Sequence, residues 1–125
     1  MPPTDTSGPV GLPVPLAAFV DAANAGEANT LLDTFADDAL VNDQLKEYWH
    51  KAAISRWIEL DIIGKRFAMQ VLRAVVNHGQ VVVAASVAGD FDMRGLPQPL
   101  ILTFYFSLRA GQIVQLLILR NEPDE

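Results

Sequence analysis

Three residues whose side chains can move protons lie close together in the middle of the chain: Asp43, Tyr48 and His50. A carboxylate, a phenol and an imidazole can each donate or accept a proton, and histidine changes its charge near neutral pH. This stretch is therefore a candidate for acid–base chemistry. Each residue also has a purely structural interpretation. Asp43 could accept backbone hydrogen bonds in a turn, Tyr48 could pack at a rim, and His50 could cap a helix or lie in water.

The residue types that other site chemistries need are missing or badly placed. The chain has no cysteine, which excludes disulfides, thiolate zinc sites and cysteine nucleophiles. Its two histidines, His50 and His78, are far apart in sequence and form no known metal-binding pattern, and His78 lies in a turn that we expect to be exposed. No glycine-rich loop is present that could hold a phosphate group. We therefore expect neither a metal nor a cofactor.

The composition is that of a small acidic protein. Its 125 residues suit one domain, and 9 Lys and Arg against 15 Asp and Glu give a net charge of −6. This balance, without any basic run, argues against nucleic acid or an anionic membrane as a partner. No secretory signal is recognisable, and no apolar run approaches the roughly 20 residues of a membrane-spanning helix. We therefore expect a cytoplasmic protein.

The sequence divides into an arm, a domain and a tail. Residues 1–13 are rich in Pro and Gly, which favours a flexible arm over a helix or a central strand. A single domain is predicted over 14–121, and 122–125 form an acidic tail.

Helical periodicity predicts three helices in the first half of the domain. Apolar residues recur at intervals of three and four, and Gly26 and Gly64 suit the ends of the first and third helices. A short strand over 39–41 and a loop over 42–51 separate the second helix from the third. The three apolar faces are Leu16, Phe19, Val20 and Ala23; Ala28, Leu31, Leu32 and Phe35; and Ile54, Trp57, Ile58 and Ile62.

The second half of the domain predicts four strands in two hairpins, because β-branched and aromatic runs are separated by turn residues. The strands cover 67–76, 81–89, 100–108 and 113–119. Helices followed by an antiparallel meander indicate an α+β fold. The last two strands are apolar on both faces, whereas a sheet with a solvated back alternates apolar and polar residues. We therefore expect a second copy of the chain to cover the outer face of the sheet, giving a homodimer.

Three stretches in this order resemble the nuclear-transport-factor-2-like superfamily, in particular its SnoaL-like branch of polyketide cyclases and proteins related to ketosteroid isomerase. They are the helical pair that runs into a strand over 26–43, Tyr48 followed by Ala-Ala-Ile-Ser-Arg-Trp at 52–57, and the four-strand meander. The resemblance covers about 14–120. It implies a cystatin-like α+β barrel, in which a curved mixed or antiparallel sheet forms a cone around three N-terminal helices and leaves an apolar cavity open at one end.

The resemblance also implies roles for individual residues. Asp43 stands where the isomerase branch has its catalytic base, so it could move a proton at a carbon beside a carbonyl or activate a water. Phe19 and Leu102 stand where that branch has its two oxyanion donors, and neither can donate a hydrogen bond, which argues against ketosteroid isomerase activity. The acid–arginine–acid site of the limonene-epoxide-hydrolase branch does not carry over either. Arg73 could face the cavity or lie exposed on its strand.

Two kinds of function follow from the resemblance. The first is a cofactor-free isomerase, cyclase or hydratase acting on a small, mainly apolar molecule, with Asp43 as general base and Tyr48 or His50 assisting. The second is a non-catalytic ligand-binding or dimeric interaction module. In both, the expected pocket lining is Phe19, Trp57, Arg73, Val83, Ala85, Leu102 and Phe104.

Overall fold

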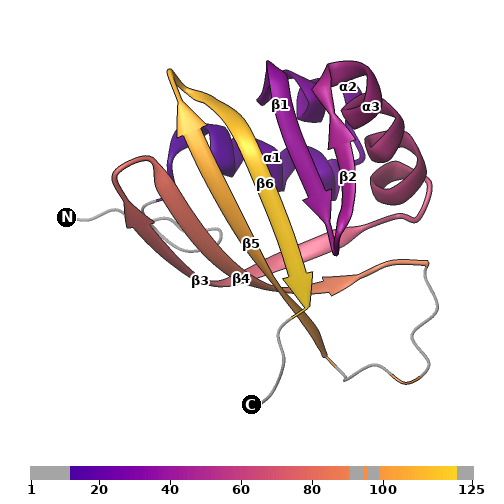
Figure 1. The fold of residues 1–125 in the computed structure, drawn as a ribbon. Helices are drawn as coiled ribbons and strands as arrows, with labels where there is room; N and C mark the ends of the chain where they lie inside the picture. The colour runs from indigo at the N-terminus through magenta and orange to yellow at the C-terminus, as the bar shows by residue number, and fades with distance from the viewer. Residues whose placement is uncertain (1–11, 91–94, 96–98, 121–125) are drawn as a thin grey trace.

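The computed structural model describes residues 12–90, 95 and 99–120 (Figure 1). The predicted arm, apart from its last two residues, and the predicted acidic tail lie outside these residues. Within them, no helix is both long enough and apolar enough to cross a membrane. The elements in chain order are α1 (Val14–Ala25), α2 (Ala28–Asp33), β1 (Phe35–Asp43), β2 (Lys46–Trp49), α3 (His50–Trp57), the π-helical segment η1 (Ile58–Ile63), β3 (Ala68–Asn77), β4 (Gln80–Ala88), β5 (Leu100–Arg109) and β6 (Gln112–Arg120).

The six strands form one mixed sheet in the order β2-β1-β6-β5-β4-β3. All neighbours pair antiparallel except β1 and β6, which run parallel. The chain between these two strands contains α3–η1 and β3 to β5, so it provides the long connection that a parallel pair needs. The sheet is curved, and α1, α2 and α3 lie on one of its faces (Figure 1). The prediction of an α+β fold with a curved sheet around N-terminal helices is confirmed.

The first helix forms where its sequence predicts. Pro15 lies in the first turn, where a missing N–H costs no hydrogen bond. The helix ends at Gly26, whose positive φ of 73° is readily available only to glycine. Its buried face includes Leu16, Phe19 and Ala23, as the apolar spacing predicts.

The prediction of a loop over 42–51 was wrong. The chain makes a two-residue turn at Gln44 and Leu45, both with positive φ, and returns as β2 along β1. This is the backbone of a type I′ hairpin, which most often carries Asn-Gly or Asp-Gly. The Asn42 side chain holds the turn by accepting a hydrogen bond from the Leu45 N–H, with 2.7 Å between Leu45 N and Asn42 Oδ1. Strand β1 is also longer than predicted, because Phe35 opens the strand and does not belong to the second helix.

The third helix widens halfway along its length. It begins at His50, two residues earlier than predicted, and from Ile58 to Ile63 it follows π-helical hydrogen bonding. Gly64 ends this segment, and its N–H donates to the Glu59 carbonyl oxygen over 2.9 Å. A Cβ at position 64 would lie 2.8 Å from that oxygen, so only glycine allows the chain to pass this closely.

The core between sheet and helices is aromatic at one end. Phe19 on α1 makes edge-to-face contacts with Phe35 and Phe106, with ring centroids 6.0 and 5.3 Å apart, and Phe104 stacks on Phe106. All four rings are buried. Aromatic packing of this kind adds to the stabilisation that comes from removing apolar area from water.

Strand β3 is an edge strand, and an α1 side chain covers part of its open edge. Asn24 Nδ2 donates to the Met69 carbonyl oxygen over 2.9 Å, and the Met69 N–H donates to Asn24 Oδ1 over 2.7 Å. One amide side chain thus satisfies both backbone groups of Met69.

Candidate functional site

A cavity of about 310 Å³ opens where the C-terminal ends of β1 and β6 meet η1 and the start of β5. Its apolar lining is Trp57, Ile62, Phe67, Leu100, Leu102 and Ile118. Its polar and charged lining is Asp43, Gln44, Lys46, Tyr48, Asp61, Lys65 and Arg120. The cavity is therefore mixed in character, with ionisable groups and hydrocarbon on the same wall.

Asp43 ends β1 at this cavity and is half-buried. Its Oδ2 accepts a hydrogen bond from Trp57 Nε1 over 3.0 Å, and its Oδ1 accepts one from Gln44 Nε2 over 3.2 Å. Two side chains, rather than the backbone N–H groups of a turn, thus hold this carboxylate. Because Trp57 is fully buried in α3, its indole N–H is a fixed donor that sets the direction of the carboxylate.

Tyr48 faces the same cavity from β2. It pairs with the buried Val41 across the hairpin, so both side chains lie on the helix side of the sheet. The Tyr48 hydroxyl donates to Asp61 Oδ2 over 3.4 Å, and its ring lies 6.2 Å from that of Trp57. Burial raises the pKa of the Tyr48 hydroxyl above its ordinary value of 10.0, and the nearby Asp61 and Asp43 carboxylates raise it further. At neutral pH this phenol is a protonated donor.

Asp61 is an acidic cavity residue that was not predicted from the sequence, and the basic lining residues Lys46, Lys65 and Arg120 were not predicted either. Asp61 lies four residues after Trp57, so the two side chains share a face of the helical segment α3–η1. That spacing was the one available signal. It was hidden because Asp61 stands between the buried Ile58 and Ile62 in an apolar stretch of sequence. The helix departs from α-helical geometry in this stretch, and such departures are frequent at functional sites.

The structure brings together only part of the predicted set. Asp43, Tyr48, Trp57 and Leu102 line the cavity. His50 does not, because β2 ends at Trp49 and His50 begins α3. Its neighbour Trp49 is 54% exposed, and His50 itself is an exposed first helical residue.

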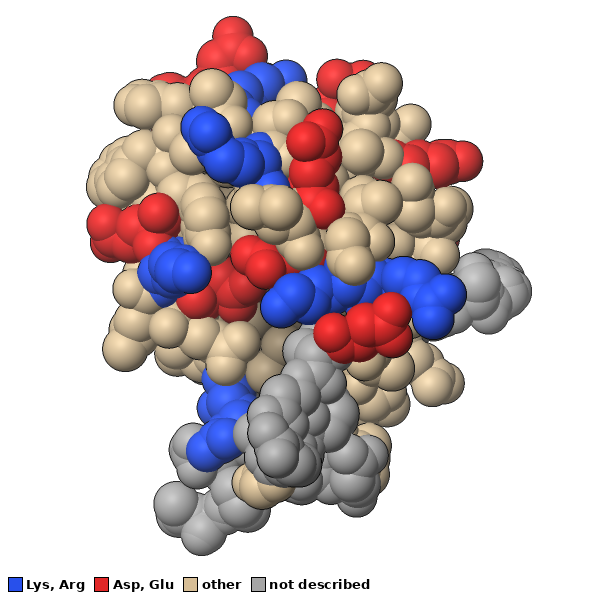
Figure 2. All heavy atoms as spheres, turned by 90° about the vertical axis from the view of Figure 1, so that its right-hand side faces the viewer, with Lys and Arg blue, Asp and Glu red and all other residues tan. Residues whose placement is uncertain are grey.

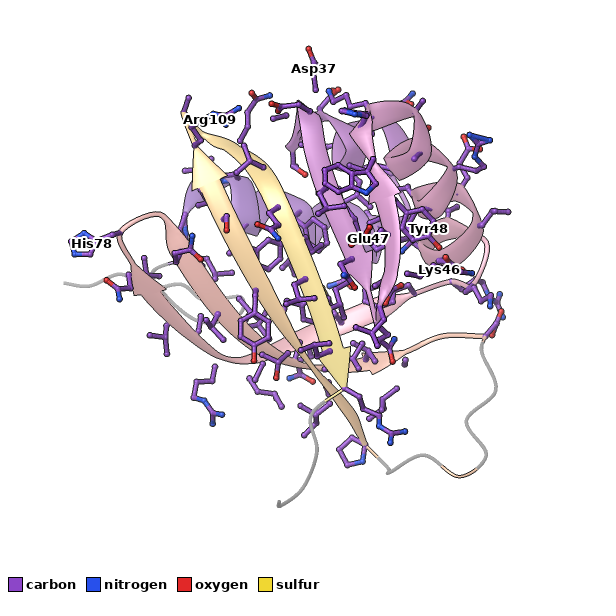
Figure 3. All side chains as sticks on the ribbon, viewed as in Figure 1. Asp37, Lys46, Glu47, Tyr48, His78 and Arg109 are labelled. Carbon is purple, nitrogen blue, oxygen red and sulfur yellow. The ribbon has the colours of Figure 1, made fainter. Side chains whose placement is uncertain are left out.

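The remaining predicted lining residues lie elsewhere. Phe19, Val83, Ala85 and Phe104 face inward as the alternation predicts, but they are packed in the core instead of around the cavity. Arg73 is exposed, because a bulge between Val71 and Arg73 shifts the alternation of β3 and leaves the arginine away from the buried face. Figure 3 shows His78 at the far tip of the β3–β4 hairpin, exposed as predicted. Among the described residues, no group of His, Asp and Glu is placed to hold a metal ion.

Comparison with known proteins relates this architecture to solved structures. No family model matches the sequence, and neither does any curated protein. A Sinorhizobium meliloti protein proposed to be a polyketide cyclase superposes with a TM-score of 0.78 and 30% identity, over 86% of this chain and 95% of its own. A protein of unknown function from Cytophaga hutchinsonii, described as nuclear-transport-factor-2-like, superposes with a TM-score of 0.71 and 11% identity, over 86% and 87% of the two chains.

The chain belongs to the nuclear-transport-factor-2-like superfamily. The S. meliloti protein places it near the SnoaL-like polyketide cyclases, as the sequence predicts. A computationally designed 17-OHP binder also superposes, with a TM-score of 0.71 and 14% identity, over 87% of this chain and 90% of the design. At this identity the likeness shows the shared fold alone.

Proposed function

We propose that the protein binds a small molecule in this cavity and catalyses cofactor-free proton transfer, with Asp43 as the general base. One observation carries the proposal: the Asp43 carboxylate lies at the cavity and is held by the Trp57 indole N–H over 3.0 Å, with the Tyr48 hydroxyl on the same wall. A base and a donor around one cavity are what proton abstraction beside a carbonyl requires.

The two groups have complementary parts in this reaction. Asp43 takes a proton from the carbon next to a carbonyl, and the electron pair of that C–H bond moves toward the carbonyl oxygen. Tyr48 donates a hydrogen bond to the oxygen that becomes negative, and Asp43 then returns the proton to the same or a conjugated carbon. The Tyr48 bond to Asp61 is long at 3.4 Å, so turning the hydroxyl toward a ligand sacrifices little.

Tyr48 supplies a donor that the isomerase positions lack in this chain. Those positions hold Phe19, which is buried in the core, and Leu102, which contributes hydrocarbon to the cavity wall. In the proposed reaction, the Tyr48 phenol on β2 takes the part of the two missing donors, from a different position in the fold. The proposal is therefore proton transfer of the isomerase or cyclase type, not ketosteroid isomerisation. The volume lies at the lower end of the roughly 300–1,000 Å³ of small-molecule sites, which favours a compact substrate.

The experiment is deuterium exchange at the α-carbon of a panel of small cyclic ketones and β-keto esters, followed by NMR in D₂O. We expect Asp43→Asn to abolish enzyme-dependent exchange, and Tyr48→Phe to lower it about 100–1,000-fold. Asp38→Asn, an exposed carboxylate outside the cavity lining, is the matched control and should leave the rate unchanged. Exchange that survives in Asp43→Asn contradicts the proposal. Saturable binding without exchange in any variant favours the non-catalytic ligand-binding module.

We also propose that a second copy of the chain covers the outer face of the sheet. Val75, Val82, Tyr105 and Leu117 pair in register across β3, β4, β5 and β6 and form a continuous apolar row on that face. Val75 is 58% exposed and Tyr105 39% exposed, which is a large apolar area to leave in water.

Charge at the two edges of this face supports an association between like copies. Glu47 lies at the β2 edge and Arg73 at the β3 edge. A two-fold axis along the strands would place the β2 edge of one copy over the β3 edge of the other, so opposite charges would meet twice. Light scattering after gel filtration should give a dimer that Tyr105→Lys dissociates, while Tyr48→Phe, on the opposite face, leaves it intact. A monomeric wild-type protein overturns this proposal.

A further inference from the structure

The mouth of the cavity is basic although the protein is acidic. Lys46, Lys65 and Arg120 line it, three of the nine Lys and Arg in a chain of net charge −6. All three are exposed, whereas Asp43 and Asp61 are half-buried. Figure 2 shows basic side chains on several sides of an acidic group on the face of the molecule that carries α3 and β2.

The carboxylates of the cavity already have donors. The Trp57 indole N–H holds Asp43, and the Tyr48 hydroxyl holds Asp61. The lysines differ, because within the described part of the chain neither Lys46 nor Lys65 forms an ion pair. The pairs that the structure contains there use Lys51, Arg66 and Arg109. Among the described residues, neither ammonium group at the mouth is thus within ion-pair distance of a carboxylate, although Lys46 is the cross-strand neighbour of Asp43.

The arrangement separates two kinds of polar group by depth. The acid–base groups Asp43 and Tyr48 lie on the cavity wall beside hydrocarbon, and the cations lie at the solvent side. Ammonium groups bind carboxylates by charge-assisted hydrogen bonds, which are stronger than neutral ones, and they attract anions from solution before contact. A ligand with an apolar body and one anionic end would contact the apolar wall and the cations at the mouth at the same time.

We propose that the molecule bound in this cavity is an organic anion, whose apolar, carbonyl-bearing body enters the cavity while its carboxylate stays at the mouth between Lys46 and Lys65. This inference deepens the proposed function and rests on it only in taking the cavity as the ligand site. It narrows the substrate class from a small apolar molecule to a small organic acid.

The test uses two probes with the same aromatic body, of which only one is charged. 2-Naphthoate carries a carboxylate, and 2-naphthamide is its neutral counterpart with the same aromatic body. By calorimetry or NMR titration we expect the wild-type protein to bind 2-naphthoate about tenfold or more tightly than 2-naphthamide. Raising sodium chloride from about 20 mM to about 500 mM should weaken binding of the anion and leave the amide unchanged.

Variants test whether Lys46 and Lys65 cause the preference for the anion. Lys46→Gln combined with Lys65→Gln should lower the affinity for 2-naphthoate about tenfold and leave that for 2-naphthamide unchanged. Lys51→Gln is the matched control, because Lys51 pairs with Asp37 and does not line the cavity. Figure 3 shows Asp37 at the opposite end of the strands from Lys46. Filling the cavity by Leu102→Trp should abolish the binding of both probes.

The outcomes separate this inference from the proposed catalysis. Asp43→Asn removes the base but keeps both lysines, so it should retain 2-naphthoate binding while losing exchange activity. Equal affinity for the two probes, or loss of both in the double lysine variant, overturns the organic-anion inference and leaves the role of Asp43 intact. Failure of both probes to bind counts against the cavity as a ligand site, and therefore against the inference and the proposed function together.

Discussion

The space between the sheet and the helices has two ends that are built differently. At one end, Phe19, Phe35 and Phe106 interlock and are fully buried. At the other end, the same sheet opens into a cavity of about 310 Å³ whose wall carries Asp43 and Tyr48. The filled end gains stability from packing, and the open end lacks that packing and leaves the space that the proposed ligand would occupy. Substitutions at the filled end should therefore act on stability, and those at the open end on binding and chemistry.

The largest expected effect is at the filled end. Phe106→Ala removes a ring that contacts both Phe19 and Phe104. The lost burial and the space left behind should lower the free energy of unfolding by about 3–5 kcal/mol, measured by urea denaturation. Phe106→Leu keeps most of the volume and should lose clearly less. A loss below about 1 kcal/mol for the alanine variant would mean that the two ends do not differ in this way.

A smaller loss of stability should follow from Gly64→Ala, which acts on the segment behind the open end. The new Cβ would lie 2.8 and 2.9 Å from the Glu59 and Leu60 carbonyl oxygens, so the end of η1 must move. We expect about 1–3 kcal/mol of destabilisation, as for other overpacked sites. Glu59→Ala keeps the carbonyl oxygen in place and should change stability by less than about 0.5 kcal/mol. Equal stability of Gly64→Ala and wild type would contradict the close approach.

Asp43→Asn should change stability little, because the new amide oxygen can still accept the Trp57 hydrogen bond. We expect a free energy of unfolding within about 1 kcal/mol of wild type, together with complete loss of exchange activity. Unchanged stability with lost activity is the clearest test of the difference between the two ends, since Phe106→Ala should lower stability and leave the residues of the cavity in place. Collapse of the fold in Asp43→Asn would make the carboxylate structural.

The smallest expected effect on stability comes from the ionisation of Tyr48 and occurs only in alkaline solution. The folded-state pKa of Tyr48 is raised above 10.0, so as the pH rises past 10 the unfolded chain loses this proton first. The contribution of Tyr48 to stability is present below pH 10 and is lost as the pH approaches the folded-state pKa. Tyr48→Phe should therefore show a shallower alkaline decline in stability than wild type.

Absorbance titration of the Tyr105→Phe variant, in which Tyr48 is the remaining tyrosine, measures the same pKa directly. The midpoint should lie above 10, and adding Asp61→Asn should lower it, because that change removes a neighbouring negative charge. A midpoint that Asp61→Asn leaves unmoved would show that the carboxylate does not act on the phenol.

Periodicity predicted most of the fold. Apolar spacing placed α1 and the four strands of the meander within one or two residues, and the order of elements predicted the α+β class. The hairpin of β1 and β2 escaped, because Gln44 and Leu45 adopt left-handed backbone conformations that short sequence patterns associate with Asn and Gly. Strand β2 is held by its pairing with β1 and by the hydrogen bond of Asn42 in the turn. Residue propensities predict neither interaction.

The site was less predictable than the fold. Asp43, Tyr48, Trp57 and Leu102 were placed at the cavity from the resemblance. Alternation along a strand tells which residues face inward, but not whether the space that they face is filled. Phe104 and Leu102 are alternate residues of β5, and one packs in the core while the other lines the cavity. Asp61 needed a three-dimensional partner, Tyr48, to be recognised.

The bridge from Asn24 to Met69 has a consequence for how copies of this chain can associate. An open strand edge offers its backbone to any extended chain, which is how sheets extend into aggregates and fibrils. By taking both backbone groups of Met69, the Asn24 amide acts as a one-residue substitute for a seventh strand. At the opposite edge, β2 is only four residues long and carries Lys46 and Glu47. Both edges thus discourage indefinite growth of the sheet by strand pairing, and the dimer that we propose would instead use its broad outer face, where association would stop at a closed pair.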